Sequence, residues 1–167
     1  ESRSDWPAAI EAYGGVGRTS EHFGAAIAGL STAWNQRLQQ RAGAEDVDVR
    51  SLAEQAASQF QQAILSTEGA LPESWTPADR AAALGAATIM LAHLPSRAAD
   101  AEGILRTALS AEPVPPDDWK QSAVATLIVA LAVQEGRSEE AISLLVEQKQ
   151  AVPQQLLDLL SGLQSAA

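Results

Sequence analysis

An alanine followed four residues later by a bulky side chain recurs at long, similar intervals along this chain. The four pairs are Ala9/Tyr13, Ala56/Phe60, Ala101/Leu105 and Ala141/Leu145, and successive pairs are about 40 to 47 residues apart. Residues four apart lie on one face of a helix, and a small residue on that face lets a neighbouring helix approach closely. Helical units that return at this interval are typical of proteins in which pairs of helices stack side by side.

Capping residues, glycines and prolines divide the chain into helices. Thr76, Pro77 and Asp79 together form a helix start. Thr19 or Ser20 is the predicted cap of a long helix and Ser96 that of a later one, and a glycine and several prolines mark turns. We therefore expect a single repeat domain over residues 1–167. Its parts are a partial repeat helix (1–15), three helix pairs (19–66, 76–110 and 117–149) and a closing helix (153–164) whose leucines lie on one side.

The composition favours helices over sheets. Apolar residues make up 46% of the chain, aromatic residues only 4%, and alanine dominates the apolar set. Alanine has the highest helix propensity, whereas the β-branched runs that strands prefer are nearly absent. The predicted fold class is all-α.

Over most of its length the sequence resembles the tetratricopeptide repeat (TPR) family, and the resemblance is clearest near the C-terminus. Between Ala125 and Pro153, an apolar helix is followed by Gly136 at a turn, by "EEAI" at the start of a second helix, and by Leu145. The stretch "WPAAIEAY" near the N-terminus looks like the second helix of a preceding repeat. The resemblance implies a right-handed α-α superhelix of about three antiparallel helix pairs with a C-terminal capping helix. It also implies that the first helix of each pair lines a concave face.

The charge balance excludes some classes of partner. The net charge is −10, from 21 acidic and 11 basic residues, and only two of the basic residues are lysines. Nucleic-acid binding needs clustered Lys and Arg, so we expect no nucleic-acid partner. A protein or peptide partner fits this charge better, and a basic one would be attracted by it. No apolar run reaches the length of a membrane span, and the absence of cysteine excludes disulfides and thiolate metal sites.

We find no pattern that indicates catalysis, a cofactor or a metal site. His22 and His93 have no partner at metal-ligand spacing. The stretch "YGGVGRTS" lacks the spacing and the lysine of a phosphate-binding loop, and is expected to be a glycine helix end with a flexible connector. The acid pairs 117–118 and 139–140 stand at predicted helix starts, where the helix dipole favours them. We therefore expect that the protein is not an enzyme.

Four residues are candidates for contact with a partner: Trp34, Trp75, Thr88 and Thr126. Thr88 and Thr126 occupy similar positions on the first helices of successive pairs, where their hydroxyls either donate to a bound peptide or bond back to their own helix. Trp34 lies on an apolar stripe and Trp75 in a loop that it would hold down. Trp34 and Trp119 are core residues by default, and an exposed Trp would instead anchor a partner.

The predicted function is a non-catalytic scaffold that binds a partner protein or peptide. The alternative is a structural spacer or homo-oligomerisation domain of a larger protein, such as one of the cell envelope. The chain begins at Glu1, and we expect it to be part of a longer or processed protein. The compartment is therefore left open between the cytoplasm and, if a signal or anchor segment was removed, the periplasm or envelope.

Overall fold

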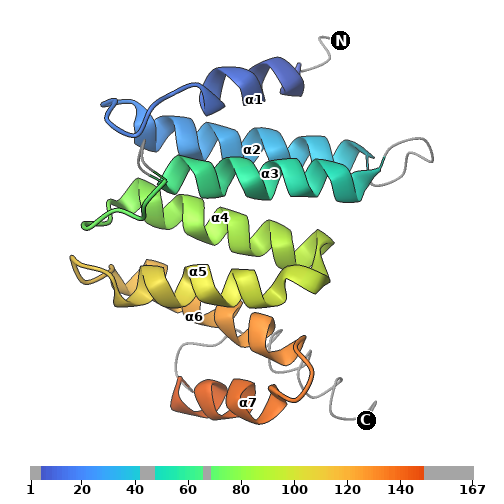
Figure 1. Ribbon diagram of the computed structural model, residues 1–167, viewed down its shortest axis with the longest axis vertical. Helices are drawn as coiled ribbons and strands as arrows, with labels where there is room; N and C mark the ends of the chain where they lie inside the picture. The colour runs from blue at the N-terminus through green and yellow to red at the C-terminus, as the bar shows by residue number, and fades with distance from the viewer. Residues whose placement is uncertain (1–4, 42–47, 66–68, 149–167) are drawn as a thin grey trace.

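The protein is all-α over the residues that the computed structural model describes, which are 5–41, 48–65 and 69–148. These residues contain seven α-helices, one short 3₁₀ helix and no strand, so the predicted fold class is confirmed. The elements are α1 (Trp6–Gly14), α2 (Phe23–Arg41), α3 (Val49–Ile64), α4 (Pro77–His93), η1 (Pro95–Arg97), α5 (Ala98–Ser110), α6 (Asp117–Ala132) and α7 (Ser138–Glu147). Figure 1 shows the α-helices following one another in chain order along the longest axis of the molecule. The predicted closing helix, 153–164, lies outside the described residues.

The start of α4 follows the sequence prediction in detail. The Thr76 hydroxyl accepts a hydrogen bond from the Asp79 amide at 3.2 Å, and the Asp79 carboxylate accepts one from the Thr76 amide at 2.7 Å. Pro77 occupies the first helical position, where a missing amide proton costs nothing. This reciprocal capping box satisfies two amides that a helix start otherwise leaves without partners.

Two helix starts differ from the prediction. The helix expected from Thr19 or Ser20 begins at Phe23, because the Ser20 hydroxyl accepts from the His22 amide at 3.2 Å and holds a separate turn. His22 therefore precedes the helix. The helix expected after Ser96 begins at Ala98, because η1 comes first.

Each helix packs against the next one along the chain. In addition, α2 contacts α4 and α4 contacts α6, so the first members of the three predicted pairs also meet one another. The buried apolar side chains form one continuous cluster that reaches from α1 to α7.

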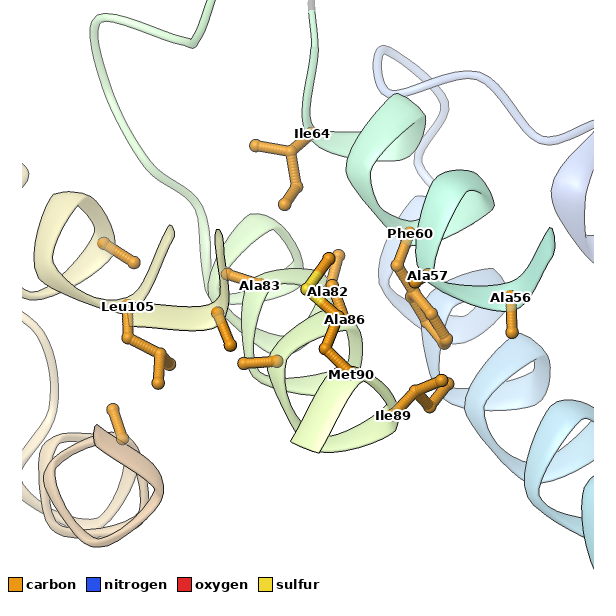
Figure 2. Close-up of a cluster of buried hydrophobic side chains, with 14 of the residues drawn as sticks. Ala56, Ala57, Phe60, Ile64, Ala82, Ala83, Ala86, Ile89, Met90 and Leu105 are labelled. Carbon is orange, nitrogen blue, oxygen red and sulfur yellow. The ribbon is translucent and has the colours of Figure 1, made fainter. Parts of the chain in front are cut away.

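Small buried side chains make these close contacts possible. Ala56, Ala101 and Ala141 lie in α3, α5 and α7, and all three are completely buried. Figure 2 shows the alanines of α4 beside Phe60 of α3 and Met90. Of the bulky partners in the repeated pattern, Phe60, Leu105 and Leu145 are buried, whereas Tyr13 of α1 is 40% exposed. The pattern thus marks the core face of α3, α5 and α7, and α1 departs from it.

We expect Ala101→Leu to lower the free energy of unfolding by about 2 kcal/mol, because three extra carbons have no space between α5 and its neighbours. Ala99→Leu is the matched control, since Ala99 lies on the same helix but is exposed, and its effect should stay below about 0.5 kcal/mol. Urea unfolding followed by tryptophan fluorescence measures both values. Equal losses in the two variants would contradict close packing at Ala101.

Candidate functional site

A shallow hollow of about 320 Å³ lies on the surface where α4 and α6 run beside each other. It brings together Thr88 and Thr126, two of the four residues that the sequence singled out. The lining residues are Thr88, Leu91 and Ala92 of α4 and Ala125, Thr126 and Val129 of α6. We refer to these six residues as the α4–α6 hollow.

The two threonine hydroxyls bond back to their own helices. Thr88 Oγ1 donates to the Leu84 carbonyl at 2.8 Å, and Thr126 Oγ1 donates to the Ser122 carbonyl at 2.8 Å. Each hydroxyl has a single proton, which these bonds use, but its lone pairs stay free to accept. The hollow therefore presents methyl groups and acceptor oxygens, and the two hydroxyls are not free donors.

No charged residue lines the α4–α6 hollow, as far as the chain is described. Acidic residues lie beyond its ends instead. Asp118, in the first turn of α6, stands eight residues before Thr126, or about 12 Å along the helix. Asp118, Ser122 and Thr126 follow at intervals of four, so they share one face of α6. Exposed Glu135 follows the other end of this helix.

Trp34 and Trp75, the other two candidates, lie in the core. Each is 2% exposed. The Trp34 ring nitrogen donates to Gln59 Oε1 at 2.7 Å, and the Arg37 guanidinium lies 5.3 Å from the ring centroid. The Trp75 amide donates to the Glu112 carbonyl at 2.8 Å, which fixes the loop before α4. Neither indole is accessible to a partner, and both are placed away from the α4–α6 hollow.

A buried ion pair beside the capping box was not predicted. Arg18 holds the completely buried Asp79 with two hydrogen bonds, from Nε at 2.7 Å and from Nη2 at 2.8 Å. Burial acts to raise the pKa of Asp79, but the hydrogen bonds from Arg18 and Thr76 outweigh it and keep that pKa below its usual value. Arg18 lies in the segment that the sequence predicts to be a flexible connector, and no local signal links it to a carboxylate 61 residues away.

The next residue, Arg80, is only 2% exposed and joins two loops. Its guanidinium donates to the carbonyl oxygens of Trp75, Ala111 and Pro113. It also lies 5.9 Å from the centroid of the Trp119 ring. The cation is therefore held by peptide dipoles and an aromatic face.

A third polar cluster joins α5, α6 and α7. Glu102, which is 9% exposed, accepts hydrogen bonds from Arg106, Gln134 and Arg137. Glu140 of α7 binds the same two arginines. Burial acts to raise the pKa of Glu102, but the three donors outweigh it and lower that pKa to about 2.

The charged side chains of these clusters are bound to other groups of the protein. Among the described residues, no group of three or more His, Asp or Glu side chains is placed to hold a metal ion. Within the same residues, no helix combines the length and the apolar character needed to cross a bilayer. Comparison with protein-family models, with curated proteins and with solved structures found no match to this chain.

Proposed function

We propose that this protein is a non-catalytic interaction module that binds an amphipathic helix of a partner protein. In this proposal the helices form the right-handed α-α superhelix of TPR-like proteins, with α2, α4 and α6 as the first helices of three pairs. The packing of α2 on α4 and of α4 on α6 supports this arrangement, because first helices of successive repeats are neighbours in such a stack.

The observation that carries the proposal is the α4–α6 hollow itself. Its six residues are small or apolar and uncharged, and it opens on the face formed by the first helices. An apolar side chain of a partner would lose its contact with water there without leaving a charged group of the hollow unpaired. Helices that bind in such grooves place apolar residues at intervals of three or four into pockets of this kind.

The charges around the hollow specify the partner further. Asp117 and Asp118 are exposed at one end of α6 and Glu135 lies beyond the other, while the lining is neutral. A helix laid along α6 would therefore place apolar side chains in the hollow and basic side chains about two turns away, beside Asp118. The net charge of −10 would also steer such a basic segment toward the protein.

Selection of helical peptides from a phage-displayed library on the whole chain tests the proposal. We expect the enriched peptides to be basic and amphipathic, and we expect Thr126→Lys to weaken their binding at least tenfold in fluorescence polarisation. A lysine there places a charge in the apolar hollow and repels a basic ligand. Thr107→Lys is the matched control, because the Thr107 hydroxyl makes the same bond, to the Gly103 carbonyl, but lies on α5. Binding to this variant should change less than twofold.

Asp118→Asn separates the charge contribution from the apolar one. We expect a three- to tenfold weaker affinity for the same peptides, and a smaller loss at high salt, because exposed charge pairs are screened. Failure to enrich any peptide, or enriched peptides that bind Thr126→Lys as tightly as the unchanged protein, would contradict the proposed function.

A further inference from the structure

A second cavity, of about 560 Å³, lies between the end of α1, the loop after it, the start of α2 and the end of α3. It is more enclosed than the α4–α6 hollow and shares no residue with it. Its size lies within the range of small-molecule sites, which are about 300–1,000 Å³. We refer to it as the α1–α3 cavity.

The floor of the α1–α3 cavity is apolar. Phe23, Ile27 and Leu30 follow at intervals of four and three, so one face of α2 supplies all three, and each is at most 5% exposed. Ala63 of α3, Leu65 just after this helix and Val16 of the loop complete the apolar lining. A hydrocarbon group placed on this floor would be removed from water on several sides.

The rim of the cavity carries polar groups from α1, the loop and α3. Tyr13, Arg18, Thr19 and Gln62 all line it. Nε and Nη2 of Arg18 are used by Asp79 and by the Ser74 carbonyl, but no described residue accepts a hydrogen bond from Nη1. Within the described residues, the Tyr13 and Thr19 hydroxyls likewise have no hydrogen-bond partner. The rim therefore has donors and acceptors that a bound molecule can use.

The walls of the α1–α3 cavity are fixed at two places where a side chain packs directly against the backbone of a glycine. A Cβ on Gly29 of α2 would lie 2.5 Å from the Tyr13 ring, so this ring rests directly on the helix backbone. A Cβ on Gly14 would lie 1.8 Å from Nε2 of Gln59. Gln59 is in turn held by Trp34, whose ring nitrogen donates to it. These contacts give the cavity a preformed shape, which lowers the ordering cost of binding.

The charge of the rim decides the class of ligand. Arg18 is the only cation among the lining residues, and the buried carboxylate of Asp79 already balances it. The site therefore offers hydrogen-bond donors without a net positive charge, above a floor of hydrocarbon. An ammonium group would find no acidic side chain among the lining residues, and a carboxylate would find its only cation already paired with Asp79.

The geometry points to a binding site for an uncharged amphipathic small molecule. Its hydrocarbon chain lies on Phe23, Ile27 and Leu30, and its carbonyl group, an amide or an ester, accepts from Arg18 Nη1 and the Thr19 hydroxyl. This site is independent of the proposed partner groove, because the two are lined by different helices, α1 to α3 in one case and α4 and α6 in the other.

Titration of the protein with octanamide, followed by two-dimensional amide NMR, tests the inference. We expect saturable binding at one site, with shifts at the amides of residues 13–19, 27 and 30. Octylamine, which has the same chain with a cationic end, should bind at least tenfold more weakly. Octanoate, with an anionic end, should also bind more weakly than octanamide. Tighter binding of octanoate would mean that the site selects an anion and would overturn the uncharged class.

Val16→Trp places a large side chain at the edge of the cavity without touching the buried floor, and it should weaken octanamide binding at least tenfold. Val114→Trp is the control, because Val114 is 78% exposed in a distant loop, and it should leave the affinity unchanged. Circular dichroism verifies that both variants are folded. The inference is overturned if octanamide does not saturate, or if Val16→Trp binds it as well as Val114→Trp does.

Discussion

Arg80→Met should lower the free energy of unfolding by about 3 kcal/mol, which corresponds to a fall of roughly 6–12 °C in the midpoint of thermal unfolding for a domain of this size. Methionine replaces the aliphatic part of arginine but has no hydrogen-bond donor. The carbonyl oxygens of Trp75, Ala111 and Pro113 would all lose the guanidinium that they share. Each buried carbonyl without a donor costs about 1–3 kcal/mol, and part of that cost is recovered where water reaches the loop.

The position of Arg80 explains why the loss should be large. The residue stands in the first turn of α4 and bonds to the loop before this helix and to the loop after α5. The Ala111 carbonyl lies at the C-terminal end of α5, where the helix dipole favours a cation. One side chain thus holds the α3–α4 connection against the α5–α6 connection. Amide hydrogen exchange should accordingly become faster in both loops of the variant.

Arg37→Met is the matched control for this experiment. Arg37 also lies over a tryptophan, with its guanidinium 5.3 Å from the Trp34 ring centroid, but it donates no hydrogen bond to a described residue. Its loss should therefore cost at most about 1 kcal/mol, the value of a partly exposed cation–π contact. If the two variants lost the same stability, the carbonyl bonds of Arg80 would not be the cause.

The features that the sequence predicted depend on local rules. The helix start at Thr76 and the turn at Gly136, whose φ is +74°, follow from capping residues and backbone freedom. The register of the two first helices also placed Thr88 and Thr126 at similar positions, and the structure brings both into one hollow. Short-range periodicity is enough for such features, because neighbours three or four residues apart determine them.

The features that the sequence missed depend on pairs that lie far apart in the chain. Arg18 and Asp79 are 61 residues apart, and Arg80 reaches a carbonyl 31 residues away. An arginine in a glycine-containing loop has the same local appearance whether it is solvated or paired with a buried acid. The α1–α3 cavity was missed for the same reason, since its floor, rim and back wall come from three separate segments. Only the packing of the helices decides which of these segments meet.

Glu102→Gln should lower the free energy of unfolding by about 3 kcal/mol at pH 7, and this loss should depend on pH. Glu102 is held in its charged form by Arg106, Gln134 and Arg137, which lower its pKa from 4.5 to about 2. A carboxylate whose pKa is lower in the folded protein stabilises it fully above the unfolded value. The contribution decreases as the pH falls from about 5, and little of it remains at pH 2.

Urea unfolding of both proteins between pH 7 and pH 3 measures this effect as a difference. Glutamine does not titrate, so the gap between the two free energies should shrink from about 3 kcal/mol at pH 7 to about 1 kcal/mol at pH 3. Other acids, including Asp79, titrate in both proteins and cancel in the comparison. A gap that stays constant over this range would mean that glutamine weakens packing and that the charge of Glu102 does not matter.

Glu139→Gln supplies the control on the neighbouring helix. Glu139 is exposed in the first turn of α7 and forms no ion pair with a described residue, whereas Glu140 beside it binds both arginines of the cluster. The control should lose less than about 1 kcal/mol at pH 7, the value of an acid at a helix start. The difference between the Glu102→Gln and Glu139→Gln variants matters for the proposed module, because the Glu102 cluster is the polar contact that fixes α7 against α5 and α6. If acid loosens this contact first, lowering the pH to 3 should accelerate amide hydrogen exchange more in α7 than in α3 and α4.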